Sequence, residues 1–584
     1  MKALKRILEY LRPYWLTVTG AFLSLLLVSV ANLFSPLVLG YAIDQGITSG
    51  ALGVIGLATG ALLLIALVRG LFSFTQSYWI EKASQHAVYD LRNQLYAHTE
   101  RLSFSYHDQV QTGQVMTRIT NDVDQVRLFM SSGFVQILSA LLMLLGTATI
   151  LIMLNWQLAL IALAMIPIVG GIFFSFFRSV GPRFREVQQK LGFLNTVLQE
   201  NLAGVRVVKA FAREQYELER YSRANVELLN ENLKVRRAIS FSFPAIFFIA
   251  NLGTLAVIWI GGLQVIGGVL TLGELVAFNT YLVFLIMPVM TIGFSITAIV
   301  QANVSAARIC EVLDTPFEVA DKPAATMLPP VRGRVVFTDV GFRYQGSDSP
   351  SLHDVSFTVE PGQTVAIMGR TGSGKSSIIN LIPRFYDVTA GSVTIDGYDV
   401  RDVTLTSLRS QIGIVLQDAV LFSGTVRENI AYGRPTASDA EIEAAARAAQ
   451  AHEFVLELPN GYDTVIGERG VGLSGGQRQR IAIARTLLLD PAVLIFDDST
   501  SAVDAETEYR IQQALIPLLA ERTALIIAQR MSTIRNADLI LLLDQGRLVN
   551  QGTYDYLREN CGTFCELLDA QFGTTEEMAE EILI

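Results

Sequence analysis

Residues 364–385 read TVAIMGRTGSGKSSIINLIPRF, an apolar strand-like run followed by a glycine-rich loop and a helical run. The middle of this stretch fits the phosphate-loop pattern G-x-x-x-x-G-K-[ST] in its usual context between a strand and a helix. Glycines let backbone N–H groups close around phosphate oxygens, the lysine neutralises phosphate charge, and the hydroxyl next to it binds Mg²⁺. The pattern predicts a nucleotide-binding loop formed by Gly369, Arg370, Thr371, Gly372, Ser373, Gly374, Lys375, Ser376 and Ser377.

The sequence around this loop predicts an α/β domain, because short apolar runs alternate with helical segments. The runs cover residues 364–368, 393–395, 412–415, 493–496, 524–528 and 539–543. One of them, AVLIFD, ends at Asp497 and predicts a buried strand that presents this carboxylate to Mg²⁺. We expect the domain over residues 333–572, followed by an acidic tail over 573–584.

A second anion-binding pattern lies between the loop and Asp497. Leu473 to Gln477 read LSGGQ and open the helical run RQRIAIARTLL. A serine and two glycines at a helix N-terminus leave N–H groups free at the positive end of the helix dipole. One chain therefore has two separate phosphate-binding patterns.

The N-terminal half is predicted to cross a membrane six times. The chain of 584 residues is 51% hydrophobic with a mean hydropathy of +0.40, which is too apolar for a wholly soluble protein. A helical span needs about 20 apolar residues. Six stretches provide them: residues 16–42, 52–80, two within 128–177 separated by a turn at 155–157, 238–273 and 275–307. Arg69 interrupts the second stretch, and either faces a water-filled cavity or snorkels or pairs with a neighbouring helix.

Basic residues set the predicted orientation. The outer connections at 45–50, 155–157 and 264–272 contain no Lys or Arg, whereas the inner connections at 81–127 and 178–237 contain many. The N-terminus and the α/β domain are therefore expected in the cytosol.

The two inner connections are polar but helically patterned, which predicts helical hairpins. At 1.5 Å per residue each would project roughly 30 to 45 Å below the membrane. Their tips, residues 106–113 and 211–216, are expected to dock into a partner domain. The proline-rich residues 314–332 are expected to form a linker.

Charge and cysteine content exclude other classes of protein. The net charge of −9, without a Lys/Arg block, excludes a nucleic-acid partner. The three cysteines have neither metal-site spacing nor the pattern of a disulfide framework.

Six spans, a phosphate loop and LSGGQ together resemble an ATP-binding cassette (ABC) transporter of the exporter type, over essentially the whole chain. The resemblance implies an α-helical membrane domain at 1–313 with long cytosolic extensions, joined to an α/β ATPase domain. It also implies ATP and Mg²⁺ as cofactors. LSGGQ is the signature of this family. Two ATPase domains of the family dimerise head to tail, and each ATP lies between the phosphate loop of one domain and the signature of the other. The chain is then a half-transporter that needs a second half-transporter subunit.

The resemblance assigns further roles to single positions. Tyr344 matches the aromatic residue that stacks on adenine. Gln417 matches the glutamine that joins Mg²⁺ and the attacking water to the two inner helical hairpins, which form the transport arms. Mg²⁺ is expected at Ser376, Gln417 and Asp497. Residues 501–504 match a loop at the dimer interface, and residues 467–470 match a segment that touches the arms, although Val465 replaces a usual Glu. The signature residues expected to bind the partner's ATP are Ser474, Gly475, Gly476 and Gln477.

Two positions depart from the family pattern. Asp498 stands where a glutamate polarises the attacking water, and the missing methylene withdraws the carboxylate by about 1.5 Å. Gln529 stands in place of the switch histidine and cannot be protonated. Each ATP site has two half-sites, one with a phosphate loop and one with a signature. Both departures belong to the half-site that contains the chain's own phosphate loop. The pattern predicts a slow site here, as in one subunit of a heterodimeric bacterial exporter.

The leading hypothesis is a multi-pass subunit of an ATP-driven exporter in the bacterial inner (cytoplasmic) membrane, in contact with membrane lipid. Its substrates would be amphipathic compounds, namely drugs, lipids or peptides. One alternative is an ATP-gated channel or regulatory subunit, since a site that retains ATP suits a long-lived open state. The other is an active homodimeric exporter or lipid flippase in which Asp498 and Gln529 are tolerated variants.

Overall fold

The computed structural model describes residues 2–467, 470, 472–497, 519, 522–528 and 530–572. The chain divides into two compact units. The membrane unit contains residues 1–100 and 113–315, and the ATPase unit contains residues 101–112 together with the chain from Pro316 onward. The short segment 101–112 therefore belongs with the C-terminal unit although it lies between two membrane helices in the sequence.

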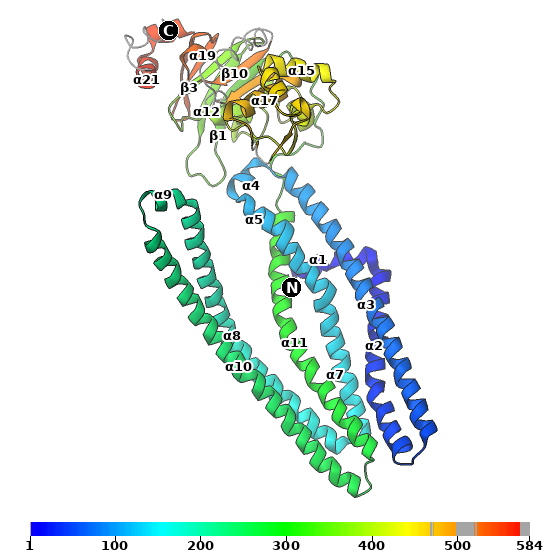
Figure 1. The fold of residues 1–584 in the computed structure, drawn as a ribbon. Helices are drawn as coiled ribbons and strands as arrows, with labels where there is room; N and C mark the ends of the chain where they lie inside the picture. The colour runs from blue at the N-terminus through cyan, green and yellow to red at the C-terminus, as the bar shows by residue number, and fades with distance from the viewer. Residues whose placement is uncertain are drawn as a thin grey trace. The chain divides into compact units, whose positions relative to one another are not determined.

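Six helical stretches of the membrane unit are long and apolar enough to cross a bilayer, which confirms the predicted spans (Figure 1). The main helices of this unit are α1 (Lys2–Leu8), α2 (Trp15–Tyr41), α3 (Leu52–Arg101), α5 (Thr112–Thr117), α6 (Val123–Leu128), α7 (Phe134–Leu154), α8 (Trp156–Ala203), α9 (Val205–Ala210), α10 (Glu214–Ile266) and α11 (Leu272–Leu313). Short 3₁₀ or π-helical turns at Glu9–Tyr14, Ala42–Ile47, Arg118–Asp122 and Phe129–Gly133 connect several of them.

Polar side chains close the outer turns between these helices. Asn155 alone separates α7 from α8, a tighter turn than the three residues expected, and its side chain caps α8 by accepting from the N–H groups of Gln157 and Leu158. Thr271 and Glu274 form a capping box at the start of α11. These caps satisfy backbone donors where the chain reverses direction.

Two charged side chains tie membrane-unit helices together. Asp122 is 2% exposed and accepts from Arg308 Nε at 2.8 Å and from Ser305 Oγ at 2.8 Å, which joins the first inner connection to α11. Arg69 donates to Asn32 on α2 at 3.4 Å. For Arg69 this contact favours the expectation of a helix-paired arginine.

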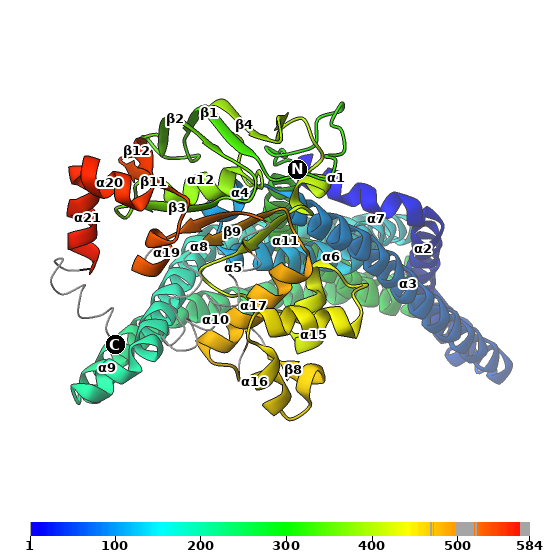
Figure 2. The same cartoon turned by 90° about the horizontal axis from the view of Figure 1, so that it is seen from above.

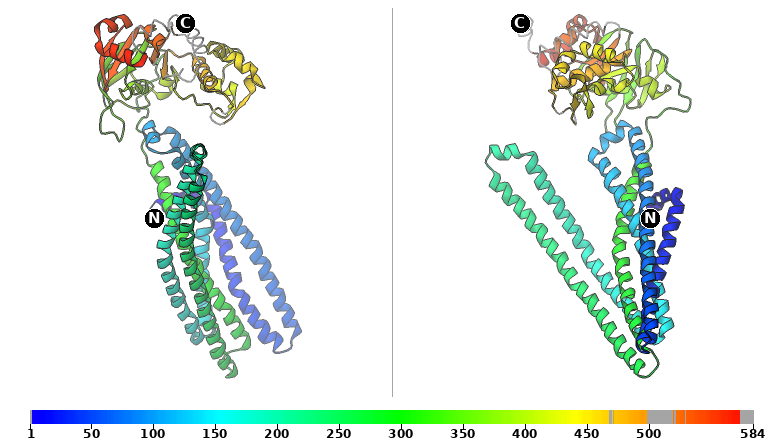
Figure 3. Two further views of the ribbon diagram at one scale, coloured as in Figure 1. Left: turned by 60° about the vertical axis from the view of Figure 1, so that its left-hand side comes forward. Right: turned by 45° about the vertical axis from the view of Figure 1, so that its right-hand side comes forward.

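Helices α8 and α10 form a long antiparallel hairpin with α9 at its tip (Figure 3). Salt bridges cross the hairpin from Lys190 to Glu227 and from Arg220 to Glu200, each at 2.6 Å. This hairpin is the second of the two predicted inner arms.

The ATPase unit contains the predicted α/β domain. Its strands are β1 (Val335–Phe342), β2 (Leu352–Val359), β3 (Thr364–Gly369), β4 (Ala390–Ile395), β5 (Tyr398–Asp399), β6 (Ile412–Val415), β7 (Gly424–Thr425), β8 (Val465–Ile466), β9 (Val493–Asp497), β10 (Thr523–Ile527), β11 (Leu539–Asp544) and β12 (Arg547–Gly552). Its helices are α4 (Phe104–Gln109), α12 (Lys375–Leu381), α13 (Leu405–Arg409), α14 (Val426–Ile430), α15 (Asp439–Ala448), α16 (His452–Glu457), α17 (Gly475–Leu488), α19 (Met531–Arg535), α20 (Tyr554–Asn560) and α21 (Gly562–Phe572).

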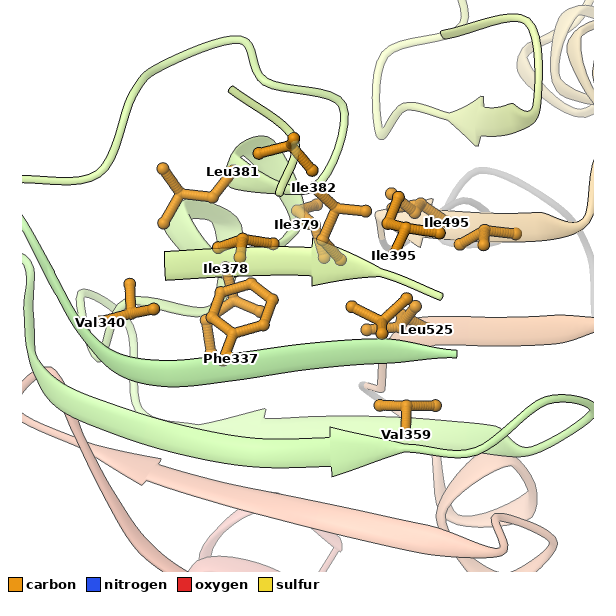
Figure 4. Close-up of a cluster of buried hydrophobic side chains, with 14 of the residues drawn as sticks. Phe337, Val340, Val359, Ile378, Ile379, Leu381, Ile382, Ile395, Ile495 and Leu525 are labelled. Atoms are coloured by element: carbon orange, nitrogen blue, oxygen red, sulfur yellow. The ribbon is translucent and has the colours of Figure 1, made fainter. Parts of the chain in front are cut away.

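Two large sheets, a two-stranded sheet of β7 and β8, and a helical subdomain build the described part of this unit (Figure 2). The larger sheet has the order β12-β11-β3-β10-β9-β6, and the smaller one has the order β2-β1-β4-β5. Helix α12 shares one apolar core with both sheets, where Ile378 and Ile379 lie close to Phe337 of β1 (Figure 4). Burial of such side chains contributes about 1.5 to 3 kcal/mol each, so the phosphate loop before α12 rests on a rigid base.

The predicted linker packs along the ATPase domain from Pro316 onward. Leu328 is buried in the core shared with β1, and its N–H donates to Ser407 Oγ at 2.9 Å. The side-chain amide of Gln411 donates to the carbonyls of Leu328 and Pro329. An irregular segment is held here because side chains satisfy its backbone polar groups.

Candidate nucleotide-binding site

One edge of the larger sheet gathers the predicted site residues. Strands β3, β10, β9 and β6 are parallel, with Ile527 paired to both Ile367 and Asp497, and Val415 paired to Phe496. Parallel strands end at the same edge of a sheet, which is where α/β folds bind ligands. The edge therefore presents the start of the phosphate loop, the carboxylate that ends β9 and the segment after β6.

The phosphate loop adopts a backbone conformation that requires glycine. Gly369 has φ +151° and Gly374 has φ +99°. A Cβ at Gly369 would lie 2.2 Å from the carbonyl oxygen of Leu543, and one at Gly374 would lie 2.7 Å from Leu352. Any other residue would force the loop away from the sheet, so the glycines are explained by the fold itself.

Lys375 and Ser373 provide polar groups inside the loop. The Lys375 ammonium donates to the carbonyls of Gly369 at 2.8 Å and Arg370 at 2.9 Å. Burial lowers the pKa of Lys375, and the charge of Asp497 opposes this decrease. Ser373 is 3% exposed, and within the described part of the chain its Oγ has no hydrogen-bond partner. A partly buried cation and an unsatisfied hydroxyl in one loop fit a polyphosphate.

The residues expected to hold Mg²⁺ supply only oxygen donors. Ser376 lies in the first turn of α12, Asp497 ends β9, and Gln417 follows β6 by two residues. Among the residues that the structure describes, no group of three His, Cys, Asp or Glu side chains forms a metal cage. Mg²⁺ is commonly held by one carboxylate together with substrate phosphates and other oxygens, so this donor set fits it. The ion would neutralise phosphate charge when bound.

Tyr344 is a half-buried part of an aromatic group beside the loop. Its ring lies edge-on to Phe342 at 4.7 Å and to Tyr386 at 5.2 Å, and its hydroxyl forms a hydrogen bond with Ser377 Oγ at 3.1 Å. The contact with Ser377 places Tyr344 next to the phosphate loop. Its stacking on adenine stays a prediction.

The tip of the first arm packs on the ATPase domain of its own chain. In α4, Asp108 accepts from the Tyr386 hydroxyl at 2.6 Å, and the ring of Phe104 lies 4.4 Å from that of Phe385. Burial and the bond to Asp108 raise the pKa of the Tyr386 phenol. The docking segment is Phe104–Gln109, so it begins slightly before the predicted tip.

These contacts form a continuous path that the sequence did not reveal. It runs from Asp108 through Tyr386 and Tyr344 to Ser377, which is adjacent to the predicted Mg²⁺ ligand Ser376. The only signal in the sequence was the aromatic pair 385–386 after Pro383, and such pairs are common in cores. The structure thus adds Tyr386 to the residues that link the first arm to the phosphate loop.

The signature opens α17 as predicted. Ser474 is the N-cap residue, its hydroxyl accepts from the N–H of Gln477 at 3.2 Å, and its own N–H donates to Gln477 Oε1 at 2.8 Å. This capping box uses the side chain of Gln477 and leaves the N–H groups of Gly475 and Gly476 at the helix end without an intrahelical partner. The arrangement is a preformed anion site.

Several predicted residues lie outside the described part of the chain. They are Glu468, Arg469, Asp498, residues 501–504 and Gln529. By sequence, Asp498 directly follows β9 and Gln529 follows β10 by two residues.

Comparison with known proteins identifies the family. The family model of the ABC transporter transmembrane region matches residues 18–289, and the ABC transporter family model matches residues 352–501. The chain is 38% identical over 582 residues to an ATP-dependent lipid A-core flippase of Syntrophus aciditrophicus, covering 100% of this chain and 96% of the flippase.

This chain is an ABC exporter half-transporter.

Two further similarities support the assignment. A putative multidrug export ATP-binding/permease protein of Staphylococcus aureus is 38% identical over 575 residues, with 97% of this half-transporter and 100% of the relative covered. The structure of a bacterial Atm1-family ABC exporter with ATP bound superposes with TM-score 0.79 and 34% identity, covering 96% of this chain and 98% of that one. The half-transporter is thus a multi-pass membrane protein with an ATP-binding ATPase domain, of a family that functions as dimers.

Proposed function

We propose that this half-transporter is the slow-site subunit of a heterodimeric bacterial exporter that moves amphipathic compounds outward across the cytoplasmic membrane. Drugs, lipids or peptides are its candidate substrate classes, and the relatives named for multidrug export and lipid A-core flipping support the first two. The observation that carries the proposal is the combination of Asp498 and Gln529 with an intact signature at 473–477.

The two substitutions act on hydrolysis rather than on binding. A general base must lie within about 2.6 to 3.2 Å of its water, and a misplacement near 1 Å costs around a hundredfold in rate. Asp498 is shorter than glutamate by one methylene, so its carboxylate is withdrawn from the water. Gln529 donates a hydrogen bond to a phosphate but cannot carry a positive charge.

Binding of ATP depends on groups that are intact. Lys375 and the loop N–H groups would bind the phosphates, Tyr344 would stack on adenine, and Ser376, Gln417 and Asp497 would hold Mg²⁺. The chain's own site would therefore retain ATP for a long time. Its signature residues, Ser474 to Gln477, would complete the site where the partner subunit hydrolyses ATP.

The arms would transmit closure of the ATPase domains to the membrane helices. The first arm contacts its own domain through Asp108 and Tyr386. The tip of the second arm is α9 and the residue that follows it, where Val207 is 61% exposed and Phe211 is 73% exposed. Exposed apolar groups at an arm tip suit docking, and we expect this tip to enter the ATPase domain of the partner. The N-terminus and both ATPase domains would lie in the cytosol.

The test is to purify the chain with and without the product of the neighbouring transporter gene and to measure ATP hydrolysis in each preparation. We expect slow turnover by the chain alone and at least about tenfold faster turnover by the pair. High turnover by the isolated chain would overturn the proposal and favour an active homodimer.

The partner sequence provides a second test. It should carry Glu and His at the two positions and an altered signature, because each site combines residues of both chains. A partner with the same Asp and Gln would contradict the proposed division of labour.

A further inference from the structure

A groove between α8 and α10 lies at the cytosolic border of the membrane helices. It encloses about 570 Å³, within the usual range for small-ligand sites. Its lining includes two arginines, three serines and several apolar residues, among them Arg183, Arg237, Ser175, Ser179, Ser242, Phe176 and Phe241. The groove therefore combines cationic, hydroxyl and aromatic groups on two packed helices.

The depth of the groove follows from the sequence. The charge-free run of α8 ends just before Arg178, and the charge-free run of α10 begins just after Arg237. Helix α8 continues inward from Ser175 to Arg183, while α10 runs outward from Arg237. On each helix the arginine is therefore the lining residue nearest the cytosol, and the other lining residues lie further into the membrane. This is the level at which phospholipid headgroups of the inner leaflet lie.

The charges of the groove are uncompensated. Closer to the tip of the hairpin, Lys190 pairs with Glu227 and Lys234 pairs with Glu231, both at 2.6 Å. In contrast, neither Arg183 nor Arg237 has a hydrogen-bond or ion-pair partner in the described part of the chain, and no carboxylate lines the groove. Two like charges facing one cavity repel each other unless an anion lies between them.

The apolar part of the groove has a rigid wall. The ring of Phe176 lies edge-on to Phe177 at 5.3 Å and to Phe243 at 6.3 Å. Phe241 lines the groove from α10 and is 78% exposed. Hydrocarbon chains would cover this exposed ring, so the apolar end of the groove suits an acyl chain and not water.

We propose that this groove binds an anionic phospholipid of the inner leaflet. Arg183 and Arg237 bind the headgroup phosphate, the serine hydroxyls donate to its oxygens, and the acyl chains extend along Phe176 and Phe241. Basic pockets between helices at the cytosolic face are a known mode of lipid binding. A bound lipid would neutralise two repelling arginines where the hairpin leaves the membrane, and would thereby stabilise the base of the second arm.

The test measures lipid binding by the full-length chain purified in a neutral detergent. Dioctanoyl phosphatidylglycerol is titrated and bound molecules are counted by native mass spectrometry, with dioctanoyl phosphatidylcholine and inorganic phosphate as separate arms. For Arg183→Gln with Arg237→Gln we expect binding of phosphatidylglycerol to weaken roughly tenfold or more, because two headgroup contacts are removed. Phosphatidylcholine binding should stay unchanged.

A matched control removes the same charge at the same level. Arg185 and Arg236 are exposed and do not line the groove, so Arg185→Gln with Arg236→Gln should bind phosphatidylglycerol like the parent chain. Arg183→Lys with Arg237→Lys should retain most of the preference for phosphatidylglycerol, because the charge is kept. Ser179→Leu provides a second way to block the groove should the double glutamine variant fail to fold.

Three outcomes would overturn the proposal. The first is an unchanged preference for phosphatidylglycerol in both the double glutamine variant and Ser179→Leu. The second is an equal loss of phosphatidylglycerol binding in the control variant. The third is competition by inorganic phosphate that is as effective as competition by the lipid. The last result would assign the arginines to a free anion instead of a lipid. None of these measurements involves ATP hydrolysis, so their outcome is independent of the proposed function.

Discussion

The phosphate loop and the signature are both anion sites of one ATPase domain, yet they are built in different ways. The loop is a segment of positive-φ glycines at the edge of the larger sheet, and Asp497, which is expected to hold Mg²⁺, ends a strand at that same edge. The signature is a capped helix N-terminus in which Ser474 and Gln477 close a capping box and Arg478 donates to the carbonyl of Leu473 at 2.9 Å. The loop therefore combines backbone N–H groups with side chains expected to bind Mg²⁺. The signature is expected to bind phosphate mainly through the N–H groups of its helix end.

Under the proposed function, this difference lets one chain hydrolyse ATP slowly at its own loop and still complete the partner's ATP site with its signature. Under the proposed function, a change at Asp498 or Gln529 would slow hydrolysis at the chain's own loop and leave the N–H groups of Gly475 and Gly476 in place. Selection on one half-site is thus separable from selection on the other. Substitutions at the two half-sites test that separation.

The largest effect is expected from Gly475→Asp in the complex with the partner. The new carboxylate would face the phosphate at the signature, and losing anion stabilisation there should lower ATP hydrolysis by about a hundredfold or more. Aspartate in the first turn is favourable for a helix, so the fold should be unaffected. Steady-state ATPase measurement checks the result, and retained activity would show that the signature does not serve the fast site.

The next effect is a gain. Asp498→Glu with Gln529→His should raise ATP hydrolysis by the isolated chain by roughly ten- to a hundredfold, because the base and the switch charge are restored. Each single substitution is the control and should give a smaller rise. No increase in the double variant would mean that the slow turnover has another origin.

A smaller effect is expected from Lys375→Met in the complex. Loss of this cation should weaken nucleotide binding at the chain's own loop, while hydrolysis at the partner's site should fall by only about tenfold or less, through coupling between sites. Nucleotide binding and ATPase activity are measured on the same preparation. A loss as large as that of Gly475→Asp would remove the distinction between the two half-sites.

The smallest effect concerns the path from the arm to the loop. Tyr386→Phe removes the 2.6 Å bond to Asp108 and keeps the aromatic contacts, so it should lower the coupling free energy by about 0.5 to 1 kcal/mol. Substrate-stimulated ATPase should decrease while ATP binding is unchanged. Tyr398→Phe, at a half-exposed ring of the same domain, is the matched control. Equal behaviour of the two variants would exclude Tyr386 from the path.

Local sequence patterns predicted much of the fold. Apolar runs, of which only the second contains a charge, located six spans because an ionisable group is costly in hydrocarbon, and the runs ending at Gly369 and Asp497 became strands β3 and β9. The helix start at Ser474 was also predicted, because capping depends on residues three apart. Each of these features depends on neighbours in the chain.

Other features depend on residues far apart in the sequence and were not predictable. The bond between Asp108 and Tyr386 joins positions 278 residues apart, and the packing of Leu328 against Ser407 turns an apparent linker into part of a domain. The groove of Arg183 and Arg237 likewise requires the register of α8 against α10.

The sequence by itself determined that this protein has six apolar spans and an ATP-binding domain, and it predicted the phosphate loop and the signature, because those properties follow from local hydrophobicity and from backbone groups within a few residues. The tertiary structure decided which side chains from distant parts of the sequence are in contact. Only folding brings the first arm to Tyr386, and only folding places two arginines of separate helices in one groove, because such contacts depend on how distant segments pack together.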